Sequence, residues 1–298
     1  MSAHGLTKAG LRGDRLPRRR AVNRLMELLA WLAAAIAVAL LAIVVFSVAK
    51  RATGALSLDL VTRTPVPFSL TPVRQGLANA FVGTLVIVGL ATAMALPFGI
   101  LVAIYLIEFA RPSVRGAVSL ALDVLNGIPA IVIGIFVFGL VVVGHGQSGF
   151  AGGFALACLM LPLVARATME ILALVPSSLR EASLALGVPR WRTILSIVLP
   201  QTIGGIVTGT TLAVARIAGE TAPLLFTSAI VGTQVSWNPH QALQTIPVAI
   251  FELSESPDPK DHARAWAAAL VLLVFILVTS VTARWLATRS RRRISTSR

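Results

Sequence analysis

Long apolar runs without formal charge divide the chain, and they predict six crossings of a bilayer. A transmembrane helix needs about 20 consecutive, mostly apolar residues. Lipid offers no hydrogen-bond partners, so each run must satisfy its own backbone, and helix is the expected form. The predicted spans cover residues 28–48, 76–107, 117–143, 153–174, 193–215 and 265–283.

Two positions decide how these runs are divided. Residues 124–165 carry no formal charge, and the glycine-rich run 144–149 suits a tight turn between two crossings. The first run, 28–48, is longer than the apolar core of about 7–15 residues in a signal peptide, so we interpret it as a span. The predicted fold class is all-α, a polytopic integral membrane protein with six transmembrane helices.

The composition agrees with this pattern and argues against several functions. Hydrophobic residues make up 56% of the chain and charged residues 13%, against about 45–50% and 25% in soluble domains. One cysteine and four scattered histidines predict neither a disulfide nor a metal site. An intramembrane enzyme would need a catalytic pair such as H-E-x-x-H at membrane depth. The sequence has none, so we expect no catalytic residues.

The net charge of +14 would suggest nucleic acid as the partner of a soluble protein. Here the basic residues lie at the ends of apolar runs, as in membrane proteins whose cytoplasmic loops are basic. Eighteen Lys and Arg residues fall on the side of the termini and six on the other side. We therefore predict a multi-pass plasma-membrane protein in contact with lipid, with both termini cytoplasmic and no nucleic-acid partner.

The predicted domain organisation is one transmembrane domain, 28–287, with its core at 76–287. Basic cytoplasmic tails at 1–27 and 288–298 flank it, and a cytoplasmic loop occupies 175–195. The outer segment 221–251 is apolar but contains Gln, Asn, Thr and Pro, so we interpret it as an outer-surface or re-entrant segment. No soluble domain is expected.

The cytoplasmic loop is predicted to form two short helices. Ser178 and Glu181 have the spacing of a capping box, in which each side chain satisfies an amide at a helix start. Gly187 suits the left-handed conformation that ends a helix, and Pro189 prevents continuation. The second half of the loop is basic and aromatic. The combination favours a docking element over a plain connector.

Two arginines fall inside apolar spans and need an explanation. An arginine at a helix centre costs about 2.5–3.5 kcal/mol on insertion scales, so it usually faces a cavity or a partner. Arg216 and Glu220 are four residues apart and are expected to pair on one helix face. Arg166 lies near the end of the fourth span. The alternatives are a structural ion pair for Arg216 and snorkelling for Arg166; the functional interpretation is a cationic lining for an anion such as phosphate.

The loop resembles a known motif. Glu181-Ala182-Ser183, followed at fixed spacing by Gly187, Ile197 and Leu199-Pro200, is similar to the EAA loop of ATP-binding-cassette (ABC) importer permeases, with serine in place of the third alanine. The resemblance implies a type I importer permease whose coupling helix docks on a separate ATPase, with Glu181, Ala182 and Gly187 as coupling residues. The chain lacks a phosphate-binding loop, G-x-x-x-x-G-K-[ST]. ATP and Mg are therefore assigned to the partner, and no cofactor to this chain.

Three further strings resemble the phosphate-specific permeases of the PstA type, at residues 126–134, 215–227 and 265–272. The resemblance implies import of inorganic phosphate, an extracytoplasmic binding protein, a homologous second permease and two ATPase subunits. It also implies that Arg216, Glu220 and Arg166 belong to the translocation path. A permease for sulfate or molybdate is the alternative, and a receptor or scaffold would leave Arg216 and Glu220 without a purpose.

Overall fold

The computed structural model describes residues 16–66, 75–228 and 232–296, and within these ranges the secondary structure is helical, with no strand. The chain divides into two units, residues 1–50 and 51–298, which are described separately. The first unit holds all but the last two residues of helix α1 (Leu16–Ala52). The part of α1 that is long and apolar enough to span a membrane, Arg19–Ala52, has 34 residues and confirms the first predicted span.

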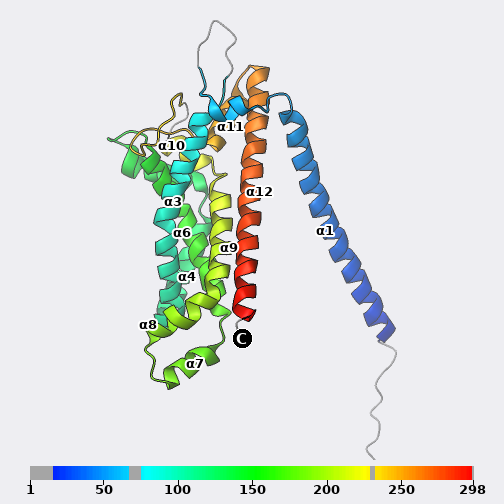
Figure 1. Ribbon diagram of the computed structural model, residues 1–298, viewed down its shortest axis with the longest axis vertical. Helices are drawn as coiled ribbons and strands as arrows, with labels where there is room; N and C mark the ends of the chain where they lie inside the picture. The colour runs from blue at the N-terminus through cyan, green and yellow to red at the C-terminus, as the bar shows by residue number, and fades with distance from the viewer. Residues whose placement is uncertain (1–15, 67–74, 229–231, 297–298) are drawn as a thin grey trace, which may run out of the picture. The chain divides into compact units, whose positions relative to one another are not determined.

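Four long helices form the core of the second unit (Figure 1). They are α3 (Ala78–Ile104), α6 (Gly149–Ala173), α9 (Leu199–Ile217) and α12 (Pro259–Thr296). The most extensive packing joins α3 to α6, and α9 packs on both α6 and α12. Ile87, Leu156 and Met160 are fully buried in the cluster between these helices. Between helices in lipid, such side chains stabilise the bundle through close van der Waals packing, because lipid tails are as apolar as the side chains.

The third span is broken, so the expected continuous helix over 117–143 is wrong. Two helices replace it, α4 (Pro112–Gly127) and α5 (Ala130–Val137), and α5 continues as a π-helical turn, Phe138–Val142. The two parts are bent by 95°. Pro129 is the cause, because proline lacks an amide hydrogen and disfavours helical backbone at the residue before it. Ile128 is accordingly extended, with ψ 129°.

The remaining spans keep their predicted places with shifted ends. The turn at 144–149 is confirmed, with Gly144 and Gly146 at φ 87° and 85°. Helix α6 begins four residues earlier than expected because the Ser148 side chain accepts a hydrogen bond from the Ala151 amide and caps it. Helix α12 extends to Thr296. It takes in most of the predicted tail at 288–298, whereas the first 15 residues of the predicted N-terminal tail lie outside the described residues.

Short helices cover one end of the bundle: α2 (Leu58–Thr62), α10 (Ala222–Thr227) and α11 (Ile246–Glu255). Asn79 on α3 donates to Gln244 at 2.8 Å, and Gln244 donates to Glu252 at 2.7 Å. These bonds hold the segment before α11 against α3. The pKa of Glu252 is raised above its ordinary value, chiefly because burial disfavours the charged carboxylate. The Gln244 hydrogen bond opposes this shift, and the nearby Asp261 carboxylate adds to it.

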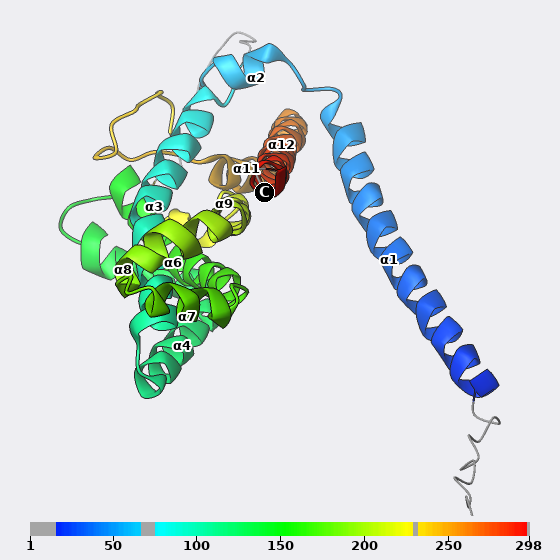
Figure 2. The same cartoon turned by 60° about the horizontal axis from the view of Figure 1, so that its bottom comes forward.

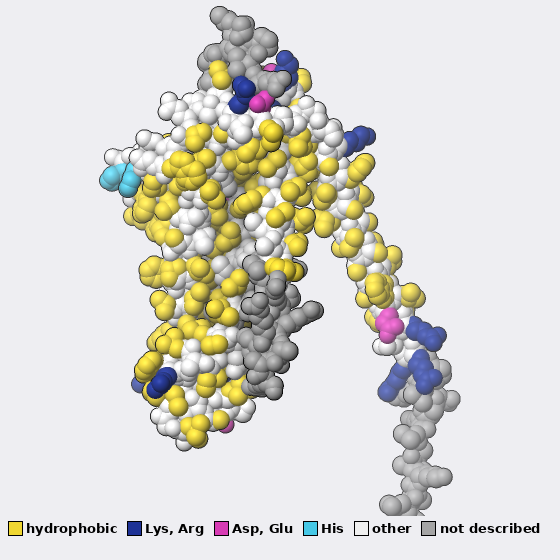
Figure 3. Space-filling model, viewed as in Figure 1, with side chains coloured by type: hydrophobic (Ala, Val, Ile, Leu, Met, Phe, Trp, Pro, Cys, Tyr) yellow, Lys and Arg dark blue, Asp and Glu magenta, His cyan; other side chains and the backbone are white. Residues whose placement is uncertain are grey.

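The helices α7 (Ser177–Ala185) and α8 (Arg190–Thr193) lie at the opposite end of the bundle (Figures 1 and 2). Five helices in the described residues are long and apolar enough to cross a membrane, and the bent pair brings the number to six. On the face in Figure 3, the charged side chains of the second unit gather at its two ends and hydrophobic side chains lie between them. The chain is a multi-pass membrane protein.

Candidate coupling loop and charged residues of the spans

The loop between α6 and α9 has the predicted form of two short helices joined by a bend. Gly187 has φ 75°, in the left-handed region. The Gly187 amide donates to the Leu184 carbonyl at 2.9 Å, and the Val188 amide donates to the Ser183 carbonyl at 3.2 Å. This pair of bonds is the Schellman motif that ends a helix. A residue with a Cβ would be strained in this conformation, so glycine is favoured at the bend.

The predicted capping box at Ser178 and Glu181 is wrong. Helix α7 starts two residues earlier than the box requires, with Pro176 at the capping position and no side-chain capping bond. Proline fits there because its fixed φ matches the backbone at a helix entry. Helix α7 is held in place instead by the contacts of Arg180. Glu181 is therefore released from capping, and its side chain is exposed on the outer surface of α7.

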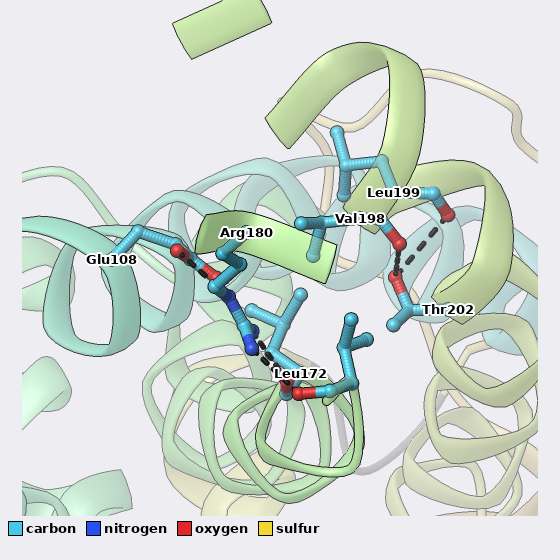
Figure 4. Close-up of polar contacts among 7 residues, drawn as sticks. Glu108, Leu172, Arg180, Val198, Leu199 and Thr202 are labelled. Atoms are coloured by element: carbon cyan, nitrogen blue, oxygen red, sulfur yellow. Dashed lines mark hydrogen bonds and ion pairs between the residues drawn. The ribbon is translucent and has the colours of Figure 1, made fainter. Parts of the chain in front are cut away.

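Arg180 ties α7 to the ends of α3 and α6 (Figure 4). Its Nε donates to both carboxylate oxygens of Glu108, at 3.1 and 3.2 Å, and its Nη2 donates to Oε1 at 2.9 Å. Its Nη1 donates to the Val175 carbonyl at 2.6 Å, and Nη2 also donates to the Leu172 carbonyl at 2.9 Å. The last carbonyls of a helix lack partners within it, so a guanidinium at the end of α6 satisfies groups that would otherwise stay unpaired.

Glu108 lies in a π-helical turn, Tyr105–Phe109, that continues α3. Its side chain is 10% exposed and that of Arg180 is 22% exposed. A carboxylate this buried needs a charged partner, because desolvation penalises an isolated charge. The ion pair therefore joins two elements that are far apart in the sequence and fixes α7 against the bundle.

A second link crosses the bend itself. The hydroxyls of Ser183 on α7 and Thr193 on α8 are 2.8 Å apart, and each residue is 4% exposed. Ser183 is the residue that departs from the E-A-A pattern, and its hydroxyl supplies a hydrogen bond that alanine would lack. α8 runs without a break into the π-helical turn Ile194–Val198 and α9. The two arms of the loop are thus tied both to each other and to the spans.

The loop exposes three large apolar side chains. Leu186 is 83% exposed, Trp191 61% and Leu184 44%. Glu181 and Ala182 are exposed beside them on α7. Large exposed apolar side chains that cluster together mark an interaction site on a protein surface.

Arg216 and Glu220 do not form the expected pair. Helix α9 ends at Ile217, so Glu220 lies beyond it and the two residues do not share a helix face. No ion pair joins them among the residues that the structure describes. Arg216 is exposed in the last turn of α9, and Leu212, four residues before it, is 45% exposed. The guanidinium therefore shares an exposed face of the isolated chain with an apolar neighbour.

Arg166 is bound to α4. Its Nη2 donates to the Ser119 carbonyl at 2.8 Å and forms an ion pair with Asp123. Arg166 lies about two helical turns before the end of α6 that joins the loop, whereas Arg216 is at the end of α9 far from the loop. The structure therefore does not bring the two arginines together.

Sequence reasoning missed Arg180, Glu108 and the Ser183–Thr193 hydrogen bond. One signal was available: Glu108 is the first acidic residue after the charge-free run 76–107. A carboxylate at the end of an apolar span needs a partner, but the sequence offers many arginines and does not say which one the tertiary structure brings close.

Comparisons with known proteins give a family and close relatives. Residues 95–292 match the family described as binding-protein-dependent transport system inner membrane component. The chain is 40% identical over 270 residues to the phosphate transport system permease protein PstA of Haemophilus influenzae, with 89% of this chain and 94% of that protein covered. It is 42% identical over 225 residues to the phosphate transport system permease protein PstA 1 of Mycobacterium tuberculosis, with 73% of this chain and 72% of that protein covered.

Solved structures share the fold at low sequence identity. A bacterial alginate ABC transporter, in complex with a periplasmic protein that carries an alginate pentasaccharide, has a TM-score of 0.59 at 19% identity, covering 94% of this chain and 98% of that one. An inward-facing MetNI methionine ABC transporter has a TM-score of 0.56 at 16% identity, covering 72% and 94%. The arrangement of helices is therefore that of ABC importer permeases.

We expect Arg180→Gln to destabilise the chain by about 3 kcal/mol, because the largely buried Glu108 carboxylate would lose its charged partner. The measurement is denaturant unfolding of the purified protein, together with the rate of proteolysis within residues 177–193. Arg192→Gln, which removes an exposed arginine of the same loop, is the control. The double variant Glu108→Gln/Arg180→Gln should be more stable than Arg180→Gln alone. Equal stability of Arg180→Gln and Arg192→Gln would contradict the assignment.

Proposed function

The chain belongs to the family of binding-protein-dependent transport system inner membrane components, and from this membership we propose that it is the permease subunit of an ATP-driven importer of inorganic phosphate. The observation that carries the proposal is 40% identity to a phosphate permease over 89% of the chain. A permease for another oxyanion, sulfate or molybdate, is the less favoured alternative, because relatives that are 39–42% identical are phosphate permeases.

The proposed assembly contains a homologous second permease, two ATPase subunits that bind ATP and Mg, and an extracytoplasmic phosphate-binding protein. The chain itself has no phosphate-binding loop, so the energy must come from a separate subunit. The exposed apolar surface of α7 and α8 supports docking of that subunit, with Glu181, Ala182 and Gly187 as the coupling residues. A similar fold occurs in a transporter complexed with a periplasmic binding protein.

We assign phosphate contact in the translocation path to Arg216, with Glu220 nearby. An exposed arginine among apolar side chains would be costly against lipid. Packing against the second permease would instead place it at a shared, hydrated path, where a guanidinium fork offers paired donors to phosphate oxygens. Arg166 is a weaker candidate for solute contact, because Ser119 and Asp123 already occupy its Nη2. Its role in the path would be to hold α4 against α6.

Transport requires that movement of the ATPase reach the spans, and the links of the loop supply a route. Arg180 connects α7 to the ends of α3 and α6 through Glu108 and the Leu172 carbonyl. The Ser183–Thr193 hydrogen bond connects α7 to α8, which continues into α9. A force on α7 would therefore move α6 and α9 together, which would open the path alternately to each side.

The proposed orientation places both termini and the α7–α8 loop in the cytoplasm. Basic residues are concentrated on that side in the sequence, which is the distribution expected for cytoplasmic segments. The turn at 144–148 and the α10–α11 segment would then face the outside, where the binding protein delivers phosphate.

Uptake by the reconstituted complex in proteoliposomes is expected to saturate with radiolabelled phosphate and to resist competition by sulfate and molybdate. We expect Arg216→Gln to lower phosphate uptake by about tenfold or more, because a desolvated anion would lose its charge-assisted hydrogen bonds. Arg63→Gln, at an arginine paired with Asp59 outside the spans, is the control. Preferred uptake of sulfate or molybdate would support the alternative, and normal uptake by Arg216→Gln would remove Arg216 from the path.

We expect Gly187→Val to separate ATP hydrolysis from transport. A β-branched residue at φ 75° is strained by about 1–2 kcal/mol, so the bend between α7 and α8 would change. Gly187→Asn is the control, because asparagine tolerates the left-handed region. The measurement is phosphate imported per ATP hydrolysed. A ratio unchanged in Gly187→Val would refute a coupling role for the bend.

The orientation is tested by labelling intact cells with a membrane-impermeant maleimide. The single cysteine, Cys158, is first replaced by serine. His145→Cys, at an exposed position in the turn before α6, should be labelled from outside. Ser178→Cys, exposed on α7, should be labelled only after permeabilisation. The reverse pattern would invert the proposed orientation.

A further inference from the structure

A cavity of about 430 Å³ lies between the α7–α8 loop and the ends of the spans, behind the surface assigned to docking. Its size falls in the range of about 300–1,000 Å³ typical of small-molecule sites. Five separate segments of the chain contribute to its walls, so the cavity exists only when the loop is seated on the bundle. The lining residues that matter here are Glu108, Arg115, Arg180, Leu184 and Arg190.

The charge in this cavity is unbalanced. Three guanidinium groups face one carboxylate, and that carboxylate, Glu108, is held by Arg180. Arg115 on α4 and Arg190 on α8 have no acidic partner among the residues that the structure describes. Two positive charges from different elements are therefore available to a ligand. Since both residues are exposed, an anion can reach them without rearrangement of the loop.

The chemistry of the cavity favours a phosphate group as its ligand. A guanidinium donates two parallel hydrogen bonds to phosphate oxygens, and two of them can hold one phosphate from two sides. The remaining wall includes the apolar Ile107, Leu184 and Ile194. Glu108 ends the apolar run of α3, so the cavity is at the level where a span leaves the bilayer. Basic pockets at that level between transmembrane helices bind lipid headgroups.

We propose that this cavity binds a phosphate-bearing anion, either the headgroup of an anionic lipid or free inorganic phosphate. Because Arg180 and Leu184 belong to α7 and Arg190 to α8, a bound phosphate group bridges both arms of the loop to Arg115 on α4. Occupancy would stabilise the seated position of the loop. The inference holds for any transported solute and does not require that phosphate be the cargo.

The test compares Arg115→Gln/Arg190→Gln with Arg111→Gln/Arg192→Gln in the purified transporter complex, reconstituted in nanodiscs. Each double variant removes two exposed arginines. Arg115 and Arg190 lie on α4 and α8, whereas Arg111 is the capping residue of α4 and Arg192 lies on α8. Only Arg115 and Arg190 line the cavity. In one arm, phosphatidylcholine nanodiscs are titrated with radiolabelled inorganic phosphate, with Arg216→Gln present in every variant to remove the proposed path contact. In the other arm, nanodiscs of equal phosphatidylglycerol and phosphatidylcholine are used without free phosphate, and retained phosphatidylglycerol is quantified by mass spectrometry.

The complex with an intact cavity should bind the probe in at least one arm, and that arm identifies the source of the phosphate group. Arg115→Gln/Arg190→Gln should weaken binding by about tenfold or more, since two charge-assisted contacts are lost, whereas the control pair should bind normally. Arg115→Lys/Arg190→Lys, which keeps the charge and removes the forks, should bind with intermediate affinity.

Three results would overturn the proposal: no binding in either arm, equal weakening by both glutamine pairs, or loss of the ATPase subunits from Arg115→Gln/Arg190→Gln without a change in probe binding. The last result would assign the arginines to a protein carboxylate. Neither arm measures uptake, so a complex that fails to import phosphate can still support or refute this inference.

Discussion

The Arg180 guanidinium is the contact on which the seating of the α7–α8 loop depends. It neutralises Glu108, whose side chain is 10% exposed, and it satisfies the Leu172 and Val175 carbonyls at the end of α6. Breaking this pair would leave a largely buried carboxylate without its bound partner and two carbonyls unpaired at the same time. The loop is consequently held as part of the bundle, and its movement is movement of the helices beneath it.

Lipid imposes the second constraint, because the bilayer core offers no hydrogen bonds to an exposed backbone. The chain meets this constraint with helices throughout its described spans, and it interrupts them only at a position with a covalent cause, Pro129. The apolar bilayer core also bears on the position of Arg216. A guanidinium on the apolar surface of α9 is costly against lipid, and a shared, hydrated surface with a second permease is the setting that would remove this cost.

The two faces of the α7–α8 loop differ in chemistry. The outer face presents Leu186 and Trp191, which suit contact with another protein. The inner face contributes Arg180 and Arg190 to a cavity with surplus positive charge. Ser183 and Thr193 lie buried between the helices and join them through their hydroxyls. The α7–α8 loop can therefore contact an ATPase subunit on one side and an anion on the other. Both contacts involve the two helices that are joined at the Gly187 bend.

The sequence alone determined the all-helical membrane architecture, the places of most spans, the turn at 144–149 and the left-handed bend at Gly187. These features follow from local causes: the length of apolar runs and the conformational freedom of glycine. Only the tertiary structure decided that Pro129 bends a span by 95°, that α9 ends before Glu220, and that Arg180 meets Glu108 across 72 positions of sequence. Pairings of this kind depend on how the helices pack against one another. The sequence does not indicate which carboxylate a given arginine will contact.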